Sequence, residues 1–435
     1  MIGIFLTVLD EGDRLRLWYF TSASEKEKSF VGYAESTDGV HWSKPALGLV
    51  ERDGSRRNNL LPMPGFEGAV FRNREGGGGE EERYLCLANR EGEGVIRYHS
   101  RDGIAWRRDK ALFLPFRSDT QNVGLWDERL GRYVVYLRAW DVAPGWDQRL
   151  RTVGRIEVER LDRPAPVTPL EKGRNPHRAD LPRLTDEVAT VFRTDAGDPP
   201  GADVYNLSAL RYPADPRWYL GFPSIMDHRG GPIGEGRLEV HFAGSRDGVR
   251  WERYDRTPYV PLGPEGSPTG GMLYMGTGMV IRGDEIWQYG PAFRTDHGEP
   301  LKRRRTGDGV IYRYVQRLDG FVALEFGPSP GHCLTKPVRV DGGRLFVNAR
   351  VGEGGSLRVT LADEHGADLT GFASAECLPP GGDSVRARVR WGGDGDGDGA
   401  DDLSSLAGRA VRLRFHGRRA RLFSFYFGGG AQAGE

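Results

Sequence analysis

Three carboxylates, Glu67, Asp119 and Asp203, each stand at or shortly before a run of strand-forming residues. Carboxyl groups that converge on one pocket can cleave a glycosidic bond. One protonates the leaving oxygen, while another attacks the sugar or activates a water molecule. We therefore predict that these three residues are the catalytic set. Each also has a plain structural interpretation, because Asp and Glu commonly cap turns and bulges.

Amide and aromatic side chains near these carboxylates, or in corresponding later segments, supply candidates for substrate binding. The set comprises Gln121, Asn122, Tyr205, Tyr274, Trp287, Asp296 and His297. Tyrosine and tryptophan present an apolar ring with a polar edge, which suits a sugar. The alternative is structural: the amides satisfy backbone groups between strands, the aromatic rings belong to the core, and His297 is a packed histidine.

A repeated heptad, Ser-x-Asp-Gly-x-x-Trp, indicates how these residues are positioned. It occurs at 36–42, 100–106 and 245–251, with a fainter copy at Asp319-Gly320 and a degraded one ending at Asp162. Asp-Gly favours a tight turn because Gly adopts positive φ without strain. In each unit two strand-like runs precede a third strand that leads into the turn. Repeated units of four strands are typical of β-propeller blades.

The chain is therefore predicted to be all-β, with a five-bladed β-propeller over residues 1–325 and a β-sandwich over 326–435. The innermost strand of each blade lines the propeller axis, so residues just before these strands should meet in a central pocket. After residue 326 the strands alternate apolar and polar residues. They are expected at 344–349, 356–361, 385–391, 411–415 and 421–427.

Several segments resemble the five-bladed furanosidase-type glycoside hydrolases, the superfamily with families 32, 43, 68 and 130. The segment 66–70, Phe-Glu-Gly-Ala-Val, looks like the Phe-Ser-Gly-Ser-Ala-Val segment of family 32. Asp119 stands in place of the Asp of its Arg-Asp-Pro segment, and Asp203 in place of its acid Glu. The resemblance extends to bacterial family-32-like proteins at 33–45, 121–123 and 403–409. It implies that Asp119 stabilises the transition state and that Asp203 is the acid. Two carboxylates in one partly dry pocket disfavour each other's ionised form, so we expect the pKa of Asp203 to be raised and Asp119 to stay ionised.

Two departures from the family are visible. The superfamily places an Asp at the start of the first inner strand, whereas this chain begins inside that strand, and Asp10 lies at its far end. Asp203 is one methylene shorter than the family's Glu. These departures keep two alternatives open beside a glycosidase or a glycosyl-transferring enzyme: a glycan-binding propeller without catalysis, and a propeller recruited to another small-molecule transformation.

Composition excludes other classes of function. Lys and Arg number 61, as do Asp and Glu, so no basic excess favours nucleic acid. The basic run 302–305 is predicted to be a solvated loop. Cys86, Cys333 and Cys377 indicate reduced, buried thiols, and 392–402 an acidic loop rather than a calcium site. No cofactor, metal or membrane partner is expected. The expected partner is a small carbohydrate or glycoside, and a cytoplasmic location follows by default.

Overall fold

The computed structural model describes residues 2–21, 30–63, 67–74, 78–90, 94–115, 118–142, 149–167, 188–231, 234–299, 308–391 and 402–429. The chain divides into two compact units. The first comprises Met1–Arg282 and Ile286–Val315, and the second Gly283–Glu285 and Gln316–Glu435. The predicted boundary after residue 325 stays a prediction. Segments 302–305 and 392–401, for which loops were expected, lie outside the described residues.

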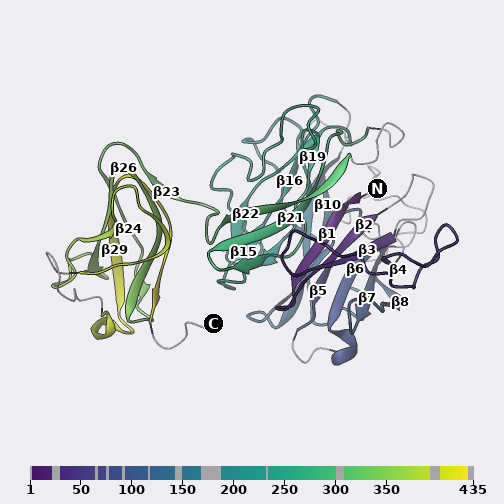
Figure 1. Cartoon of the computed structure of the whole chain (residues 1–435), viewed down its shortest axis with the longest axis horizontal. Coiled ribbons are helices and arrows are strands. Elements are labelled where there is room, and N and C mark those ends of the chain that lie inside the picture. Colours follow the sequence, from purple (N-terminus) through teal and green to yellow (C-terminus); the bar gives the residue numbers. More distant parts are fainter. Residues whose placement is uncertain are drawn as a thin grey trace. The chain divides into compact units, whose positions relative to one another are not determined.

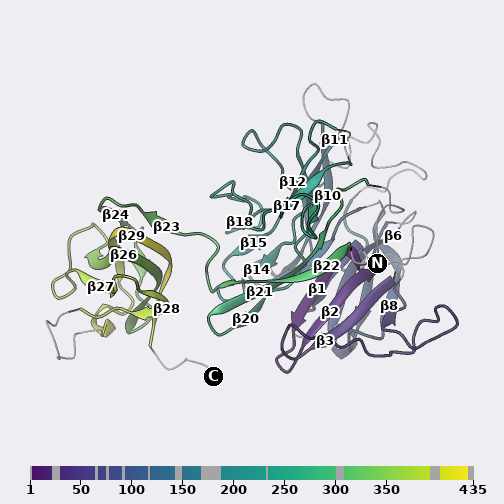
Figure 2. The same cartoon turned by 45° about the horizontal axis from the view of Figure 1, so that its top comes forward.

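The first unit begins with three four-stranded antiparallel sheets, each paired in chain order. Their strands are β1 (Ile2–Asp10), β2 (Leu15–Thr21), β3 (Phe30–Ser36) and β4 (Leu60–Leu61); β5 (Glu67–Arg72), β6 (Tyr84–Arg90), β7 (Gly94–Ser100) and β8 (Arg107–Leu114); and β9 (Val123–Asp127), β10 (Arg132–Val142), β11 (Arg149–Val158) and β12 (Ala189–Phe192). The sheets have a propeller-like arrangement (Figures 1 and 2). The all-β prediction is confirmed. Four blades can be assigned in this unit, and these three sheets are three of them.

The remaining strands of this unit do not form two separate four-stranded sheets. A three-stranded sheet contains β14 (Leu210–Arg211), β15 (Tyr219–Gly221) and β18 (Ala243–Ser245). A seven-stranded sheet contains β13 (Asp203–Asn206), β16 (Ser224–Asp227), β17 (Arg237–Val240), β19 (Met272–Leu273), β20 (Val280–Arg282), β21 (Glu285–Phe293) and β22 (Gly309–Arg317). A parallel pairing of Leu238 with Met272 joins its two halves. Five blades therefore stay a prediction.

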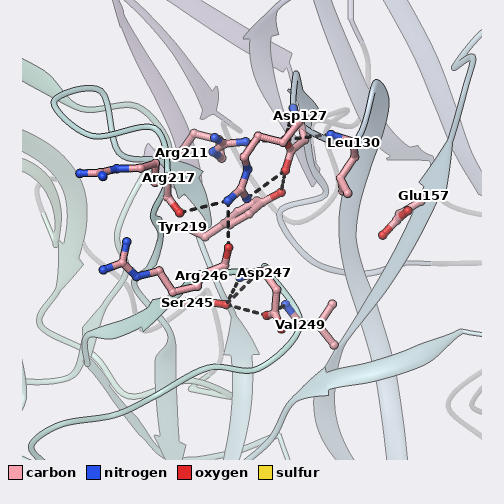
Figure 3. Close-up of polar contacts among 12 residues, drawn as sticks. Asp127, Leu130, Glu157, Arg211, Arg217, Tyr219, Ser245, Arg246, Asp247 and Val249 are labelled. Carbon is pink, nitrogen blue, oxygen red and sulfur yellow. Dashed lines mark hydrogen bonds and ion pairs between the residues drawn. The ribbon is translucent and has the colours of Figure 1, made fainter. Parts of the chain in front are cut away.

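The three strong heptads form nearly identical turns. In the turn at 245–251, the Asp247 carboxylate accepts the N–H groups of Val249 and Arg250, both at 2.8 Å. The Ser245 hydroxyl accepts the Gly248 N–H at 2.8 Å. It also donates to the Asp247 carboxylate at 3.1 Å (Figure 3). Gly39, Gly103 and Gly248 all have φ of 72°, the left-handed region that favours glycine. The heptad is thus a self-contained turn whose polar groups are satisfied locally.

Each of these turns is also hydrogen-bonded to a second sheet. The carbonyl oxygen of Gly39 accepts the Tyr289 hydroxyl, that of Gly103 the Trp18 indole N–H, and that of Gly248 the Tyr136 hydroxyl. The heptad tryptophans support this contact in two cases: Trp42 meets Tyr289 edge-on at 5.5 Å and Trp251 meets Tyr136 at 5.9 Å. Trp106 lies in the same apolar cluster as Trp18.

The fainter copy differs, because at Asp319-Gly320 it is Asp319 that has positive φ (54°). The fainter copy therefore does not form the same turn as the three strong heptads. Its Asp carboxylate instead accepts the Ser424 hydroxyl within the second unit, at 2.7 Å.

Hydrogen bonds between inner segments close the middle of the first unit. Thr7 of β1 bonds Thr277 at 2.7 Å and also accepts the backbone N–H of Val70 on β5. Gln121 donates to the carbonyl oxygen of Leu6 at 2.8 Å and accepts the Ser208 hydroxyl at 2.9 Å. These residues are buried. They separate the end of the unit where the inner strands begin, here called the start end, from the end that carries the Asp-Gly turns, the turn end.

The second unit is one hydrogen-bonded sheet around an apolar core. Its strands are β23 (Leu324–Phe326), β24 (Gly331–Leu334), β25 (Val338–Arg339), β26 (Arg344–Asp363), β27 (Ala375–Leu378), β28 (Asp383–Arg388) and β29 (Ala410–Gly428). The predicted pairs of short strands are single long strands, β26 and β29, which pair along their length with a register shift between Val351 and Ser356. A sandwich stays a prediction.

Two sequence-based expectations can be checked directly. The three cysteines are free, with Cys86 and Cys377 buried and Cys333 half-buried. Among the described residues no helix is long and apolar enough to cross a membrane.

Candidate functional site

Asp203, the first residue of β13, lies fully buried at the start end of the first unit. Its Oδ2 accepts both the backbone N–H of Arg151, at 3.1 Å, and its Nη1, at 2.9 Å. Nε2 of His228 lies 3.5 Å from the same oxygen. The other oxygen, Oδ1, is buried and has no hydrogen-bond partner among the described residues. The Asp203 carboxylate is therefore fixed through one oxygen, while its other oxygen has no described hydrogen-bond partner.

The raised pKa expected for Asp203 is wrong. Burial alone would raise the pKa, but the contact with His228 and the charge of Arg151 outweigh it, so the pKa lies below the usual value. His228 shows the reciprocal effect: burial lowers its pKa, and the contact with Asp203 more than reverses this. An ionised Asp203 does not suit the role of proton donor.

Arg138 on β10 is a second buried cation beside Asp203. It is 4% exposed, and its Nη2 donates to the carbonyl oxygen of Tyr205 at 2.7 Å. Its Nε is buried, with no partner in the part of the chain that the structure describes. Burial and the charge of Arg151 lower its pKa. Buried guanidinium groups usually face a carboxylate, so the unmet Nε marks this position as unusual.

The Tyr205 ring forms the apolar part of this cluster. The guanidinium carbons of Arg138 and Arg151 lie 5.1 Å and 5.3 Å from its centroid, within cation–π range. The rings of Tyr274 and His297 lie 5.4 Å and 4.9 Å away. Burial and the nearby charge of Asp119 raise the pKa of the Tyr205 hydroxyl.

The orientation of His297 is fixed by two hydrogen bonds. Its Nδ1 contacts the carbonyl oxygen of Gly234, which can only accept. Nδ1 therefore carries a hydrogen, and Nε2 forms a hydrogen bond with the Tyr205 hydroxyl at 3.2 Å. Tyr274 is fully buried, and its hydroxyl contacts Met272 Sδ at 3.5 Å.

Asp119 and Glu67 belong to the same neighbourhood but are partly exposed, unlike Asp203. The backbone around Asp119 is fixed on both sides, because Ser118 Oγ accepts the Arg138 N–H at 3.0 Å and the Thr120 hydroxyl donates to the Tyr205 carbonyl at 3.0 Å. Both carboxylates lie close enough to act on the pKa of Tyr205.

Glu67 and the two predicted amides are tied together by hydrogen bonds. The Glu67 carboxylate accepts the amide of Asn89, a buried residue on β6. Asn122 donates to the carbonyl oxygens of Glu67, Ser118 and Thr120 at 2.8–3.1 Å. Both Gln121 and Asn122 are buried. Their substrate-binding role stays a prediction, and their observed contacts hold the chain around the carboxylates.

Two predicted binding residues have their contacts elsewhere. Trp287 on β21 lies beside the Gly39 turn at the turn end, and Arg313 stacks on it at 4.5 Å. Asp296 is partly exposed and pairs with Arg237 at 3.1 Å. The structure thus brings Glu67, Asp119, Asp203, Tyr205, Tyr274 and His297 together, but not Trp287.

Arg138, Arg151 and His228 were missed by the sequence analysis. A signal was present for the arginines, because Arg138 directly follows the apolar run 133–137 on a strand that pairs with the strand of Arg151. An arginine inside a buried strand needs a partner. Among the described residues no three His, Cys, Asp or Glu side chains group as metal ligands do.

A cavity of about 710 Å³ lies at the other end of the inner strands. Its lining includes Leu9, Glu11, Arg72 and Ile281, from β1, β5, β20 and the turn after β1. The layer formed by Thr7, Gln121 and Ser208 separates it from the Asp203 cluster. The cavity is therefore distinct from the predicted pocket.

Comparison with known proteins gives likenesses among solved structures only, since no protein-family model and no curated protein matches the chain. A structure described as a glycoside hydrolase matches with TM-score 0.47 and 14% identity over 72% of this chain and 86% of its own. An N-acetylgalactosamine deacetylase from F. plautii, in complex with blood group B trisaccharide, matches with TM-score 0.48 and 14% identity over 73% and 89%. A thermostable family-43 glycoside hydrolase matches with TM-score 0.45 and 13% identity over 73% and 90%.

Proposed function

We propose that the protein is a carbohydrate-active enzyme of the glycoside hydrolase type, with its site at the start end of the first unit. The observation that carries this proposal is the difference in exposure among three neighbouring carboxylates. Asp119 and Glu67 are partly exposed beside Tyr205, whereas Asp203 is fully buried. Substrate can reach the first two, and hydrolysis requires two carboxyl groups, one as proton donor and one as nucleophile or base.

In this proposal Asp203 is a positioning residue rather than the acid. It holds Arg151 and His228 through its Oδ2, and Arg151 in turn lies against the Tyr205 ring. Arg138 retains an Nε without a partner among the described residues of the same cluster. Fixed donors of this kind hydrogen-bond sugar hydroxyls and orient the bond to be cleaved.

The test is a screen of aryl glycosides and natural oligosaccharides with the purified full chain. Turnover of one class is expected. Asp119→Asn and Glu67→Gln should each lower kcat by about 10²-fold or more, since each removes a reacting group. Asp215→Asn is the matched control, because Asp215 pairs with the exposed Arg217 away from the cluster. Undiminished turnover in both site variants would show that the assignment is wrong.

A glycan-binding protein without catalysis is the second candidate. It is favoured by the ionised, buried state of Asp203, which does not suit that residue to donate a proton. Isothermal titration calorimetry separates the two. Saturable binding of an oligosaccharide that is recovered intact, and that is weakened by Asp119→Asn, supports the binding protein.

We also infer that the architecture is a five-bladed propeller followed by a sandwich. Support for a fifth blade comes from β20, β21 and β22, which pair in series, and from the bond between Thr7 and Thr277 that links the last segment to the first strand. An experimental structure with four or six blades would contradict this.

A further inference from the structure

The long strand β29 of the second unit carries a row of basic side chains on one face. Its residues alternate: Val411, Leu413 and Phe415 are buried in the core, whereas the residues between and after them are Arg412, Arg414, His416 and Arg418. Successive side chains of a strand point to opposite faces, so these four share the outer face, spaced by about 7 Å.

Neighbouring strands extend this row sideways at His416. His332 of β24 pairs with His416 in register, with ring centroids 5.9 Å apart. On the other side, Arg358 of β26 pairs with His416. A cavity of about 370 Å³ lies here, and every titratable side chain that lines it is basic: His332, Arg358, His416 and Arg418. We call this cavity the basic groove.

The arginines of the basic groove are held in place by their own unit. Arg358 Nε donates to Ser374 Oγ at 2.8 Å, and Arg418 Nη2 donates to the Gly354 carbonyl oxygen at 2.6 Å. Each guanidinium keeps further N–H groups that these bonds do not use. In the described part of the chain neither the His332 side chain nor that of His416 has a hydrogen-bond partner. The groove thus offers fixed, unused donors to a ligand.

Acidic groups near the groove do not neutralise it. Arg414, next along the row, is paired with Asp368. Glu376 of β27 lies opposite Arg358 in register but does not line the cavity. The two arginines of the groove therefore give it positive charge.

We propose that the basic groove binds an acidic polysaccharide through its sulfate or carboxylate groups. Both are oxyanions, and both accept hydrogen bonds from guanidinium and imidazole N–H groups. A linear chain with regularly spaced charges matches a straight row of alternate residues on β29. Nucleic acid fits less well, because the described lining contains no Phe, Tyr or Trp on which bases stack. This proposal is independent of the function proposed for the first unit.

Affinity electrophoresis of the full-length protein tests the proposal. Gels contain a sulfated polysaccharide, a polyuronate without sulfate, a neutral polysaccharide or no polymer. Retardation by one or both acidic polymers, weakened by salt, is expected, and the two acidic arms identify the preferred oxyanion. Arg358→Gln should weaken binding by about fivefold, the effect of losing one exposed ion pair.

Arg386→Gln is the control, because it removes the same charge from an arginine that pairs with Asp284 and does not line the groove. It should retain wild-type binding. The proposal is overturned if neither acidic polymer retards the protein, if Arg386→Gln weakens binding as much as Arg358→Gln, or if duplex DNA binds as tightly as the polysaccharides. The groove residues are exposed, so thermal melting should confirm that each variant folds.

Discussion

Asp127 and Asp203 are both fully buried carboxylates beside arginines, yet their surroundings differ. Asp127 lies at the turn end, where both of its oxygens are satisfied. One accepts Arg211 Nη1 at 2.7 Å, and the other accepts the Tyr219 hydroxyl (Figure 3). Arg129 adds backbone and side-chain bonds to the same carboxylate. Asp203, at the start end, leaves Oδ1 without a partner among the described residues.

The difference distinguishes a structural ion cluster from a candidate site. Burial would raise the pKa of Asp127, but Tyr219 and the two arginines lower it to about 2. Such a group contributes to stability, and its oxygens are already occupied by hydrogen bonds and ion pairs within the protein. Unmet polar atoms at Asp203 and Arg138 are costly to keep in a folded protein, and they concentrate where a ligand completes the hydrogen bonding.

The largest predicted effect is the loss of Asp127. Asp127→Ala leaves Arg211, Arg129 and Tyr219 without their shared acceptor and should lower the free energy of unfolding by about 3–5 kcal/mol. Chemical denaturation monitored by tryptophan fluorescence measures this. Asp13→Ala, at an exposed pair with Arg14, should leave the midpoint unchanged. A loss below about 1 kcal/mol for Asp127→Ala would show that the Asp127 cluster is not a structural ion cluster.

The turn beside Asp127 gives the next largest effect. Gly248 has φ of 72°, and a Cβ placed there would lie 2.6 Å from the Tyr136 hydroxyl. Gly248→Ala should therefore cost about 2–3 kcal/mol, from backbone strain and the displaced hydrogen bond to Tyr136 together. Gly131 also has positive φ (62°), but a Cβ there would have no described neighbouring atom within 4 Å. Gly131→Ala should cost about 1 kcal/mol. If the two substitutions lower the free energy of unfolding equally, the hydrogen bond between Tyr136 and the Gly248 turn contributes nothing to stability.

These turns were predictable from sequence because their bonds are local. Ser245, Asp247 and Gly248 satisfy one another within a few residues, so the heptad alone specifies the turn. The partners of Asp203 come instead from Arg151, 52 residues away, and from His228 beyond β16. No local pattern indicates which cation will face a buried carboxylate. The wrong pKa direction for Asp203 has this cause.

The same distinction applies to the fold. Alternation predicted strands at 344–349 and 356–361 but not their union in β26, because the register shift between them depends on pairing with β29. The basic face of β29 was visible as alternation in the sequence. The sequence could not show that this face lies beside His332 and Arg358, because those residues come from the neighbouring strands β24 and β26.

A third prediction uses pH to separate the two carboxylates. Folding lowers the pKa of Asp203. Its contribution to the free energy of unfolding is therefore present above the unfolded pKa of about 3.9 and is lost as pH falls through the folded pKa. The pKa of His228 is raised, so its contribution is present below about 6.5 and is lost as pH rises through the folded pKa. Both contributions are fully present together only between about pH 4 and 6.5.

Asp203→Asn should accordingly cost about 1–3 kcal/mol at pH 5.5 and less at pH 9, where His228 is neutral. Urea unfolding at the two pH values measures the change. Asp127→Asn is the matched variant, since no histidine contacts Asp127 among its described partners, and its cost should be equal at both values. A pH-independent cost for Asp203→Asn would show that His228 is not coupled to it.

The smallest predicted effect compares two buried tyrosine hydroxyls. The Tyr205 hydroxyl bonds Nε2 of His297 at 3.2 Å, whereas the Tyr219 hydroxyl donates to the ionised carboxylate of Asp127. A hydrogen bond to an ionised carboxylate contributes about 1.5–3 kcal/mol, more than a typical bond contributes, so Tyr205→Phe should destabilise less than Tyr219→Phe. Both substitutions keep the ring, so core packing is unchanged and differences in unfolding midpoint report the hydroxyl alone. Because the Tyr205 bond also fixes the His297 ring, Tyr205→Phe should shift the nitrogen resonances of His297, while Tyr219→Phe should not. Equal destabilisation by the two variants, with His297 unperturbed, would mean that the Tyr205 hydroxyl is bonded as strongly as that of Tyr219, and the contrast between the surroundings of the two buried carboxylates would not hold.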